Sequence, residues 1–361
     1  MSRSSAHRPW KGRGLWATLA VAALAAALLL LGNSSPTANA QSPCLVASTA
    51  ESIQVVIDSL RNTGGCVHIP AGVYAVPEKV RLYSNIKVVG AGIDQTIITP
   101  GIRMDGVRMD DHLMADDSQS SRDTGIEVWN LTLRGLGPRT RSAMTGCCHG
   151  LRFVNLTDSK IINVKSENHS MDGIYLGYNN NNNVTNVRVS GCALINNWRN
   201  GISLTHGTGN IIDHCVVENN NLDDFAPGGI VLEPDEGLEV SGNIVAMNTA
   251  RQNFRGIALY AARGRLRANQ GENSICRNIV TDNRMSGVYD FNGKRNVYVV
   301  LDTDVVNNGS NGLVNFLLPG SADVIRSGDA NFLTPYVDRY CPLDTLPAAP
   351  QKPASGATSR P

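Results

Sequence analysis

Apolar positions recur along the chain in a short motif of Gly, an aliphatic residue, any residue and usually a second apolar residue. The copies begin at Gly150, Gly173, Gly201, Gly229, Gly256, Gly287 and Gly312. They follow one another at intervals of 23 to 31 residues. A period in this range is typical of solenoid proteins, in which stacked repeats bury a continuous core.

The pattern within each repeat favours short strands over helices. Alternating stretches such as 187–189 indicate strands with one buried face. Asn pairs separate the strands at 196–197, 219–220 and 307–308, and Asn tolerates the left-handed backbone of a tight corner. Parallel strands of successive repeats would stack about 4.8 Å apart. We therefore predict an all-β fold, a single-stranded right-handed parallel β-helix, which is a solenoid.

An amphipathic capping helix is predicted at the N-terminal end, where it covers strand edges that would otherwise be exposed. Residues 48–51, Ser-Thr-Ala-Glu, form a capping-box pattern. The apolar residues that follow have helical spacing: Ile53, Val56, Ile57 and Leu60. Gly64 and Gly65 end the helix, and the first strand begins at Val67.

Residues 1–40 are predicted to be a signal peptide. A basic start precedes an apolar run at 15–31, and Ala38-Asn39-Ala40 is a small-x-small cleavage signal. The alternative is an uncleaved anchor, because the run is about long enough to span a bilayer. We assign 41–340 to the β-helix domain and 341–361 to a disordered Pro/Ala-rich tail. We expect a secreted monomer, extracellular or periplasmic.

Removal of the signal peptide changes the charge balance. Lys plus Arg falls from 32 to 28 while Asp plus Glu stays at 31, so the formal charge moves from +1 to −3. This balance excludes a typical nucleic-acid-binding protein. We expect no membrane partner after cleavage.

Eight cysteines lie outside the signal peptide, as expected of a chain exported to an oxidising compartment. No CxxC pair or His/Cys cluster with zinc spacing occurs, which argues against a structural metal. We predict disulfides between Cys44 and Cys66 and between Cys276 and Cys341. The alternative to a disulfide for the equivalent Cys192 and Cys215 is a ladder of free thiols. The adjacent cysteines at 147 and 148 stay unassigned.

The first coils carry a recognisable opening. Gly-Gly-Cys-Val-His-Ile-Pro-Ala-Gly-Val-Tyr at 64–74 and Ser-Asn-Ile-Lys-Val-Val-Gly-Ala-Gly at 84–92 resemble the opening of the pectate-lyase-like superfamily. The resemblance continues through the repeats and covers roughly 45–316. It implies a parallel β-helix. It also implies a range of functions, from extracellular polysaccharide lyases, polygalacturonase-type hydrolases and uronan epimerases to phage tailspikes and surface proteins.

Stacked coils would align the residue that precedes each Gly. Side chains alternate along a strand, so we expect these residues at the outer surface near a corner: His149, Asp172, Asn200, Gly228, Arg255, Ser286 and Asn311. Tyr175 and Ser203 are the next outward positions. Together they predict a polar groove that can hold a chain-like sugar.

The polygalacturonase family has acidic residues in this column, and this chain matches it at one position. Asp172 precedes Gly173-Ile174, as in the family's Asn-Thr-Asp motif. Arg199 and Asn200 occupy the positions of the family's acid pair, and Gly228 occupies that of its His. The resemblance therefore carries over Asp172 alone, and a true polygalacturonase is not expected.

Two mechanisms remain open. Glycoside hydrolysis needs two carboxyl groups, for which Asp172 pairs with Asp224, two coils away, or with Glu233. The simplest alternative for Asp172 is a turn residue that bonds its own backbone. The acidic residues of the insertion at 101–124, including Asp116, are interpreted as solvated loop.

A lyase or C5-epimerase needs a group that neutralises the uronate carboxylate and a base that takes the neighbouring proton. Arg199 or Arg255 suits the first role, and His149, His169 or Tyr175 suits the second. No cofactor is required, although calcium bound by Asp172, Asp224 and Glu233 can replace the Arg in a lyase.

Our leading hypothesis is an extracellular glycoside hydrolase that acts on an acidic polysaccharide. The alternatives are a polysaccharide lyase or uronan C5-epimerase and a non-catalytic carbohydrate-binding or surface β-helix. The candidate catalytic residues are Asp172, Asp224, His149 and Glu233. The candidate substrate-binding residues are Arg199, Asn200, Arg255, Tyr175 and Ser203.

Overall fold

The computed structural model describes residues 43–101, 113–116, 122–137, 149–177, 183–221, 228–234, 238–260, 269–271, 273–291, 298–299, 304–309 and 324–325. The chain divides into two compact units, Met1–Pro43 and Cys44–Pro361, and the second holds the solenoid. Within the described residues no helix is long and apolar enough to cross a membrane. The predicted signal peptide and the Pro/Ala-rich tail lie outside these residues and remain predictions.

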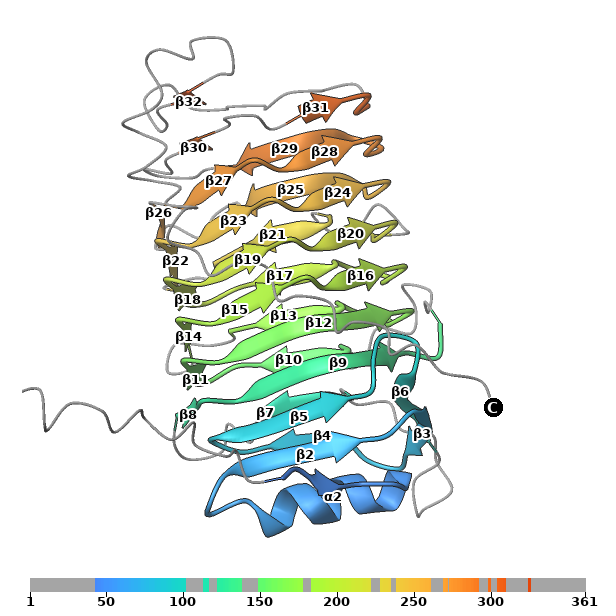
Figure 1. Ribbon diagram of the computed structural model, residues 1–361. Helices are drawn as coiled ribbons and strands as arrows, with labels where there is room; N and C mark the ends of the chain where they lie inside the picture. Colours follow the sequence, from blue (N-terminus) through green and yellow to red (C-terminus); the bar gives the residue numbers. More distant parts are fainter. Residues whose placement is uncertain are drawn as a thin grey trace, which may run out of the picture. The chain divides into compact units, whose positions relative to one another are not determined.

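The predicted capping helix is present as α2 (Ala50–Ser59) and lies beside the first coil (Figure 1). Its capping box is one residue further on than predicted. The Ser52 N–H donates to the Thr49 hydroxyl at 3.2 Å, and the Thr49 N–H donates to the Ser52 hydroxyl at 2.9 Å. Ser52 thus takes the role predicted for Glu51, and Ile53 and Ile57 are buried against the core.

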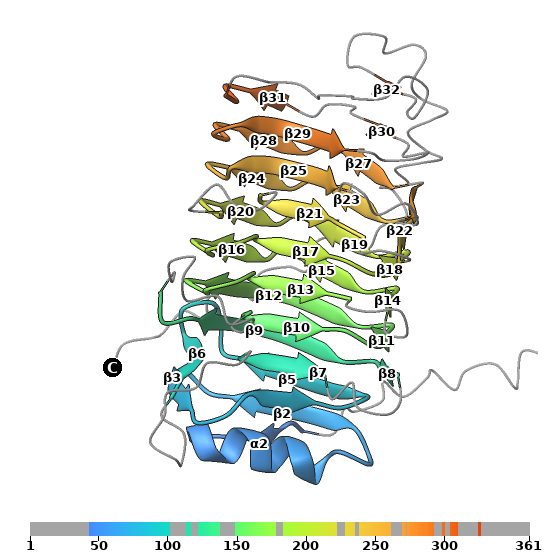
Figure 2. The same cartoon turned by 180° about the vertical axis from the view of Figure 1, so that it is seen from behind.

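Short parallel strands build three sheets that run the length of the stack (Figures 1 and 2). The eight-stranded sheet contains β4 (Val80–Leu82), β7 (Met114–Asp116), β10 (Leu151–Phe153), β13 (Ile174–Leu176), β17 (Ile202–Leu204), β21 (Ile230–Leu232), β25 (Arg255–Tyr260) and β29 (Ser286–Phe291). The six-stranded sheet contains β8 (Asp123–Thr124), β11 (Leu156–Thr157), β14 (Val184–Thr185), β18 (Gly207–Thr208), β22 (Glu239–Ser241) and β26 (Asn269–Gly271).

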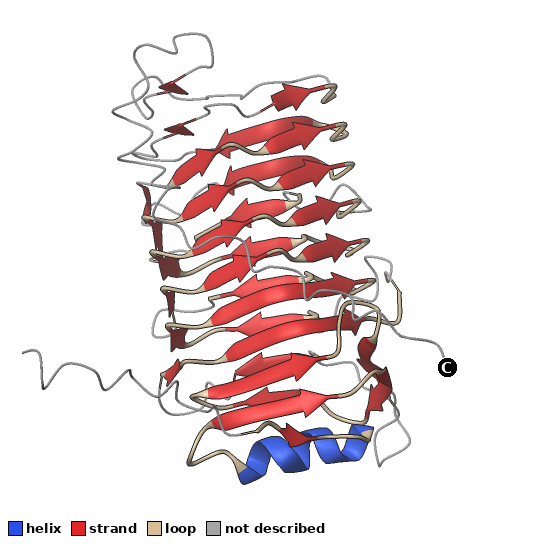
Figure 3. Cartoon of the chain, in the orientation of Figure 1, coloured by secondary structure: helices blue, strands red, loops and turns tan. Residues whose placement is uncertain are grey.

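The third sheet has 16 strands. It contains β1 (Leu45–Val46), β2 (Gly65–Ile69), β3 (Gly72–Val76), β5 (Ile86–Gly90), β6 (Thr96–Pro100), β9 (Glu127–Arg134), β12 (Lys160–Glu167), β15 (Arg188–Ser190), β16 (Ala193–Ile195), β19 (Ile211–Asp213), β20 (Val216–Glu218), β23 (Ile244–Ala246), β24 (Thr249–Arg251), β27 (Ser274–Cys276), β28 (Ile279–Thr281) and β31 (Asp304–Val306). A separate pair joins β30 (Tyr298–Val299) to β32 (Val324–Ile325). Figure 3 shows how strands dominate the molecule.

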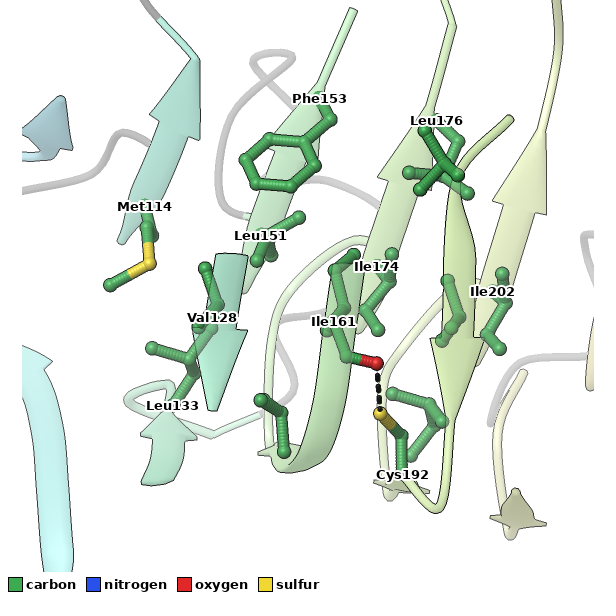
Figure 4. Close-up of a cluster of buried hydrophobic side chains, with 14 of the residues drawn as sticks. Met114, Val128, Leu133, Leu151, Phe153, Ile161, Ile174, Leu176, Cys192 and Ile202 are labelled. Atoms are coloured by element: carbon green, nitrogen blue, oxygen red, sulfur yellow. Dashed lines mark hydrogen bonds between the residues drawn. The ribbon is translucent and has the colours of Figure 1, made fainter. Parts of the chain in front are cut away.

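The Gly-aliphatic motif lies in strict register. Its first aliphatic residues are direct neighbours on successive strands of the eight-stranded sheet: Leu151, Ile174, Ile202, Ile230, Ile257 and Val288. All of them are buried, and several appear in the core shown in Figure 4. The predicted right-handed parallel β-helix is confirmed, and the copy at Gly312 lies outside the described residues.

The Asn pairs form the coil corners, as predicted, and the two residues of each pair have different roles. The first Asn adopts a left-handed backbone, with φ of 57° at Asn196 and 52° at Asn219. The second Asn is buried and bonds the next coil, because both the N–H and the side-chain amide of Asn197 donate to Asn220 Oδ1, at 3.0 and 2.9 Å. This ladder continues through Asn253, Asn283 and Asn308.

The cysteines agree with the sequence where they are described. Cys44 and Cys66 form the predicted disulfide. Cys192 and Cys215 are buried free thiols, as the alternative proposed. Cys276 is disulfide-bonded, but Cys341 lies outside the described residues, so that pairing remains a prediction.

Candidate active site

The column that precedes each Gly forms a hydrogen-bonded ladder. The Asn200 N–H donates to Asp172 Oδ1 at 3.0 Å, and the Gly228 N–H donates to Asn200 Oδ1, also at 3.0 Å. Residues 28 positions apart in the sequence are therefore neighbours in space. The predicted column exists.

The column is not exposed, which corrects the sequence interpretation. Asp172 and Asn200 are 0% exposed and His149 is 5% exposed. The physical reason is that the side chains of Asp172 and Asn200 bond the backbone of the neighbouring coil rather than water. Asp172 is thus a backbone-bonding residue, but it bonds the next coil and not its own turn.

Asp172 also holds two candidate site residues, Arg199 and His149. Arg199 donates to it in a bidentate manner, from Nε to Oδ1 at 2.7 Å and from Nη2 to Oδ2. His149 Nδ1 lies 3.2 Å from Oδ2. Burial alone would raise the pKa of Asp172, but Arg199 and His149 outweigh it and keep the pKa well below its usual range. Asp172 is therefore a carboxylate that fixes the positions of Arg199 and His149.

His149 is a neutral imidazole at neutral pH. Burial lowers its pKa below 6.5, although Asp172 opposes this effect. Nδ1 of His149 faces both the Asp172 carboxylate, at 3.2 Å, and the Asp172 backbone N–H, at 3.3 Å. We assign the proton to Nδ1, because the charged carboxylate is the stronger partner, and the backbone contact then makes no hydrogen bond. The Nε2 atom then carries the lone pair and can accept a proton.

Tyr175 completes a compact cluster with His149. Its ring centroid lies 4.6 Å from that of His149, and the guanidinium carbons of Arg199 and Arg152 lie 5.6 and 5.9 Å from it. The Thr205 hydroxyl donates to the Tyr175 hydroxyl at 3.1 Å. Burial raises the pKa of Tyr175 above 10.0, so its phenol keeps its proton and can donate it.

Asn200 and Ser203 are buried and hydrogen-bond each other next to the cluster. The Asn200 amide donates to the Ser203 hydroxyl at 2.9 Å, and both residues are 0% exposed. Their burial does not fit the direct substrate contact expected from the sequence. They hold the ladder that carries Asp172.

Glu233 and Arg255 extend the cluster along the stack. Glu233 follows β21 and is half-buried, and its charge helps to raise the pKa of Arg199. Arg255 begins β25, where its guanidinium carbon lies 4.7 Å from the Phe254 ring and 4.4 Å from the Tyr289 ring. Asp224 lies outside the described residues, so its role remains a prediction.

His169 does not join the cluster. Its backbone N–H donates to Asn197 Oδ1 at 3.1 Å, and its ring Nε2 lies 3.1 Å from the Leu133 carbonyl oxygen. Burial lowers its pKa to about 3. His169 occupies a ladder position in a corner, so its candidacy as the base is not supported.

Two residues were missed by sequence reasoning. Arg152 aligns with Tyr175 on the neighbouring strand, and extending the outward column by one coil would have found it. Asp116 was interpreted as solvated loop, but it is 5% exposed. Its carboxylate accepts the N–H groups of Val154 and Asn155, and burial raises its pKa to about 6.

Of the three residues named for a calcium site, Asp172 does not fit as a ligand, and Asp224 lies outside the described residues. Calcium binding therefore remains a prediction. Both Asp172 oxygens accept from Arg199, so Asp172 has no free carboxylate to offer a cation. Within the part of the chain that the structure describes, no group of three or more His, Cys, Asp or Glu residues could hold a metal.

Comparisons with known proteins agree with the fold. The family described as right handed beta helix region matches residues 143–317. The pre-neck appendage protein of Bacillus phage B103 is 25% identical over 275 residues, which cover 62% of this chain and 30% of that protein. The chain thus spans less than a third of this curated relative.

Two solved structures have the same architecture. The N-terminal fragment of bacteriophage phi29 gene product 12 is 17% identical with a TM-score of 0.54, over 70% of this chain and 44% of that chain. The catalytic domain of Agl-KA is 15% identical with a TM-score of 0.51, over 76% of this chain and 42% of that chain. At this identity the likenesses show the fold alone.

Proposed function

We propose that this pectate-lyase-like right-handed β-helix protein is an exported lyase that cleaves a uronate-containing polysaccharide by β-elimination. The observation that carries the proposal is the contact between the rings of His149 and Tyr175, beside the Arg199 guanidinium. The predicted signal peptide supports export.

Arg199 is suited to neutralise the uronate carboxylate. Asp172 accepts one hydrogen bond from the Arg199 Nε and one from Nη2. A guanidinium has five N–H groups, so others remain that can donate. The side chain of Arg199 stays 21% exposed while that of Asp172 is 0% exposed. Neutralising the carboxylate acidifies the adjacent C5–H bond, which is the step that elimination needs.

His149 and Tyr175 are suited to the two proton transfers. His149 Nε2 takes the C5 proton, the C5–H electron pair forms the C4=C5 double bond, and the C4–O4 bond breaks. Tyr175 gives its hydroxyl proton to the leaving O4. The resulting imidazolium and phenolate return to their resting forms by net transfer of one proton.

This geometry favours elimination over the hydrolysis that we first expected. Hydrolysis needs a carboxylic acid that can protonate the leaving group. Asp172 has a pKa well below its usual range and no exposed surface, so it does not serve as that acid. Epimerisation needs a donor on the face opposite the base, whereas His149 and Tyr175 are in contact.

The test is incubation of the mature protein with a panel of uronans and neutral glycans, first with calcium and then with chelator. Near-ultraviolet absorbance from an unsaturated uronate together with new reducing ends supports the proposal. New reducing ends without that absorbance indicate hydrolysis, and retained binding with neither indicates a binding module. Either of these two results overturns it.

A further inference from the structure

We infer that the substrate is a 1,4-linked uronan whose C5 hydrogen and O4 lie on the same face of the sugar ring. β-D-Mannuronate and D-glucuronate have this arrangement, whereas guluronate and galacturonate have these two groups on opposite faces. The inference rests on the proposed elimination and adds the stereochemistry of its substrate.

The base and the acid approach from one side. Tyr175 lies between Ile174 and Leu176, which are buried in the core, so its own side chain points away from the core. His149 contacts this ring, with 4.6 Å between the centroids and 37° between the planes. Both groups therefore act from the outer face of the eight-stranded sheet.

Such close groups suit a syn elimination. Each must come within roughly 3 Å of the atom that it serves. When H5 and O4 share a face, these atoms belong to adjacent ring positions and two touching side chains can serve both. When they lie on opposite faces, the sugar ring separates the base from the acid, and His149 and Tyr175 cannot both reach.

The two arginines fit the same orientation. A sugar that presents H5 and O4 to the sheet directs its carboxylate toward the edge of the ring. Arg152 and Arg199 lie 5.9 and 5.6 Å from the Tyr175 ring, so two guanidinium groups lie beside the position where that carboxylate would lie. Arg is well suited to this role because it matches carboxylate geometry.

The test uses four 1,4-linked polymers of equal charge density: polymannuronate, polyglucuronate, polyguluronate and polygalacturonate. We expect unsaturated product from polymannuronate, polyglucuronate or both, at a rate on the order of 100-fold above the other two, the lower bound for a correctly placed acid–base pair. Comparable or faster turnover of polyguluronate or polygalacturonate overturns this inference and leaves the elimination standing.

A matched variant separates chemistry from binding. Tyr175→Phe removes the acid and keeps the ring that contacts His149. We expect elimination from the preferred polymer to fall on the order of 100-fold while the affinity for that polymer is retained. An unchanged rate in Tyr175→Phe shows that Tyr175 is not the acid and overturns the inference. Absence of unsaturated product from all four polymers overturns the proposed function itself.

Discussion

At the scale of single residues, Asp172 has two separable duties. It accepts the Asn200 N–H in the ladder, and it carries the charge that holds Arg199 and His149. Asp172→Asn keeps a ladder acceptor and removes the charge. We expect it to lower kcat/KM at least about 100-fold, because Arg199 and His149 lose their anchor. Steady-state kinetics on the preferred uronan measure this loss.

The chain offers a matched control for that variant. Asp213 is also 0% exposed, pairs with Arg188 at 2.6 Å and contacts His214 at 3.1 Å, but it belongs to the 16-stranded sheet. Breaking either buried pair should destabilise the fold by about 3–5 kcal/mol. We expect Asp213→Asn to show this loss in urea unfolding and to keep its activity. Equal loss of activity in both variants would make Asp172 purely structural.

The pH profile follows from the same cluster. The base must be unprotonated, and the pKa of His149 lies below 6.5, so activity should fall only as pH drops below that value. The acid must keep its proton, and the pKa of Tyr175 lies above 10.0, so no alkaline loss is expected before that pH. A plot of kcat/KM against pH checks both limbs. An acid limb above pH 7 would exclude His149 as the base.

Asp116 predicts a pH dependence of stability. Its pKa rises from 3.8 in the unfolded chain to about 6 in the fold. The folded state therefore binds more protons between these values, and the stability present below pH 3.8 is lost as pH rises through 6. At 1.36 kcal/mol per pKa unit, Asp116→Asn should gain up to about 3 kcal/mol at pH 7 and little at pH 4. The measurement is urea unfolding at pH 7 and pH 4. If the prediction is wrong, Asp116→Asn changes the free energy of unfolding by the same amount at both pH values.

At the scale of elements, the corners hold the coils in register. Asn220 accepts from the Asn197 N–H and donates to the Leu194 carbonyl at 2.9 Å. Asn220→Ala leaves both buried groups without this partner, at about 1–3 kcal/mol each. The control is Asn219→Gly, since Gly adopts the left-handed backbone at φ of 52° without strain and the variant loses only the half-buried bond to Asn196 Oδ1, about 1 kcal/mol. We expect urea unfolding to show a loss of several kcal/mol for the first and a small change for the second.

These elements also show what the sequence could predict. Gly-aliphatic spacing and Asn pairs determined the coils, the corners and the contact between Asp172 and Asn200, because they report directly on the repeat. Burial of the column was not predictable, since nothing in the motif says which polar side chains bond a neighbouring backbone. Arg152 was missed because the outward column was begun at Tyr175, one coil after the strand that holds Arg152.

At the scale of the whole molecule, we expect Arg255 to form a second contact along the proposed polymer substrate. Arg255 precedes the Gly of its coil as Asn200 does, two coils earlier, and two coils span roughly 10 Å. Gly228 stands between them, where a Cβ would lie 2.1 Å from the Arg255 carbonyl oxygen. No side chain of this column therefore lies between the coil that holds Arg199 and Asn200 and the coil that holds Arg255. A polymer that lies along the stack can reach both.

Chain length of the substrate provides the test of this second site. Arg255→Met removes the charge and keeps an apolar stem between Phe254 and Tyr289. We expect KM for a long uronan to rise about tenfold, which corresponds to about 1.4 kcal/mol of lost binding, with kcat unchanged. For the shortest cleaved oligomer, which does not extend over two coils, KM should stay the same. A fall in kcat on both substrates would place Arg255 in the chemistry rather than along the bound polymer, because an interaction made only in the transition state lowers kcat.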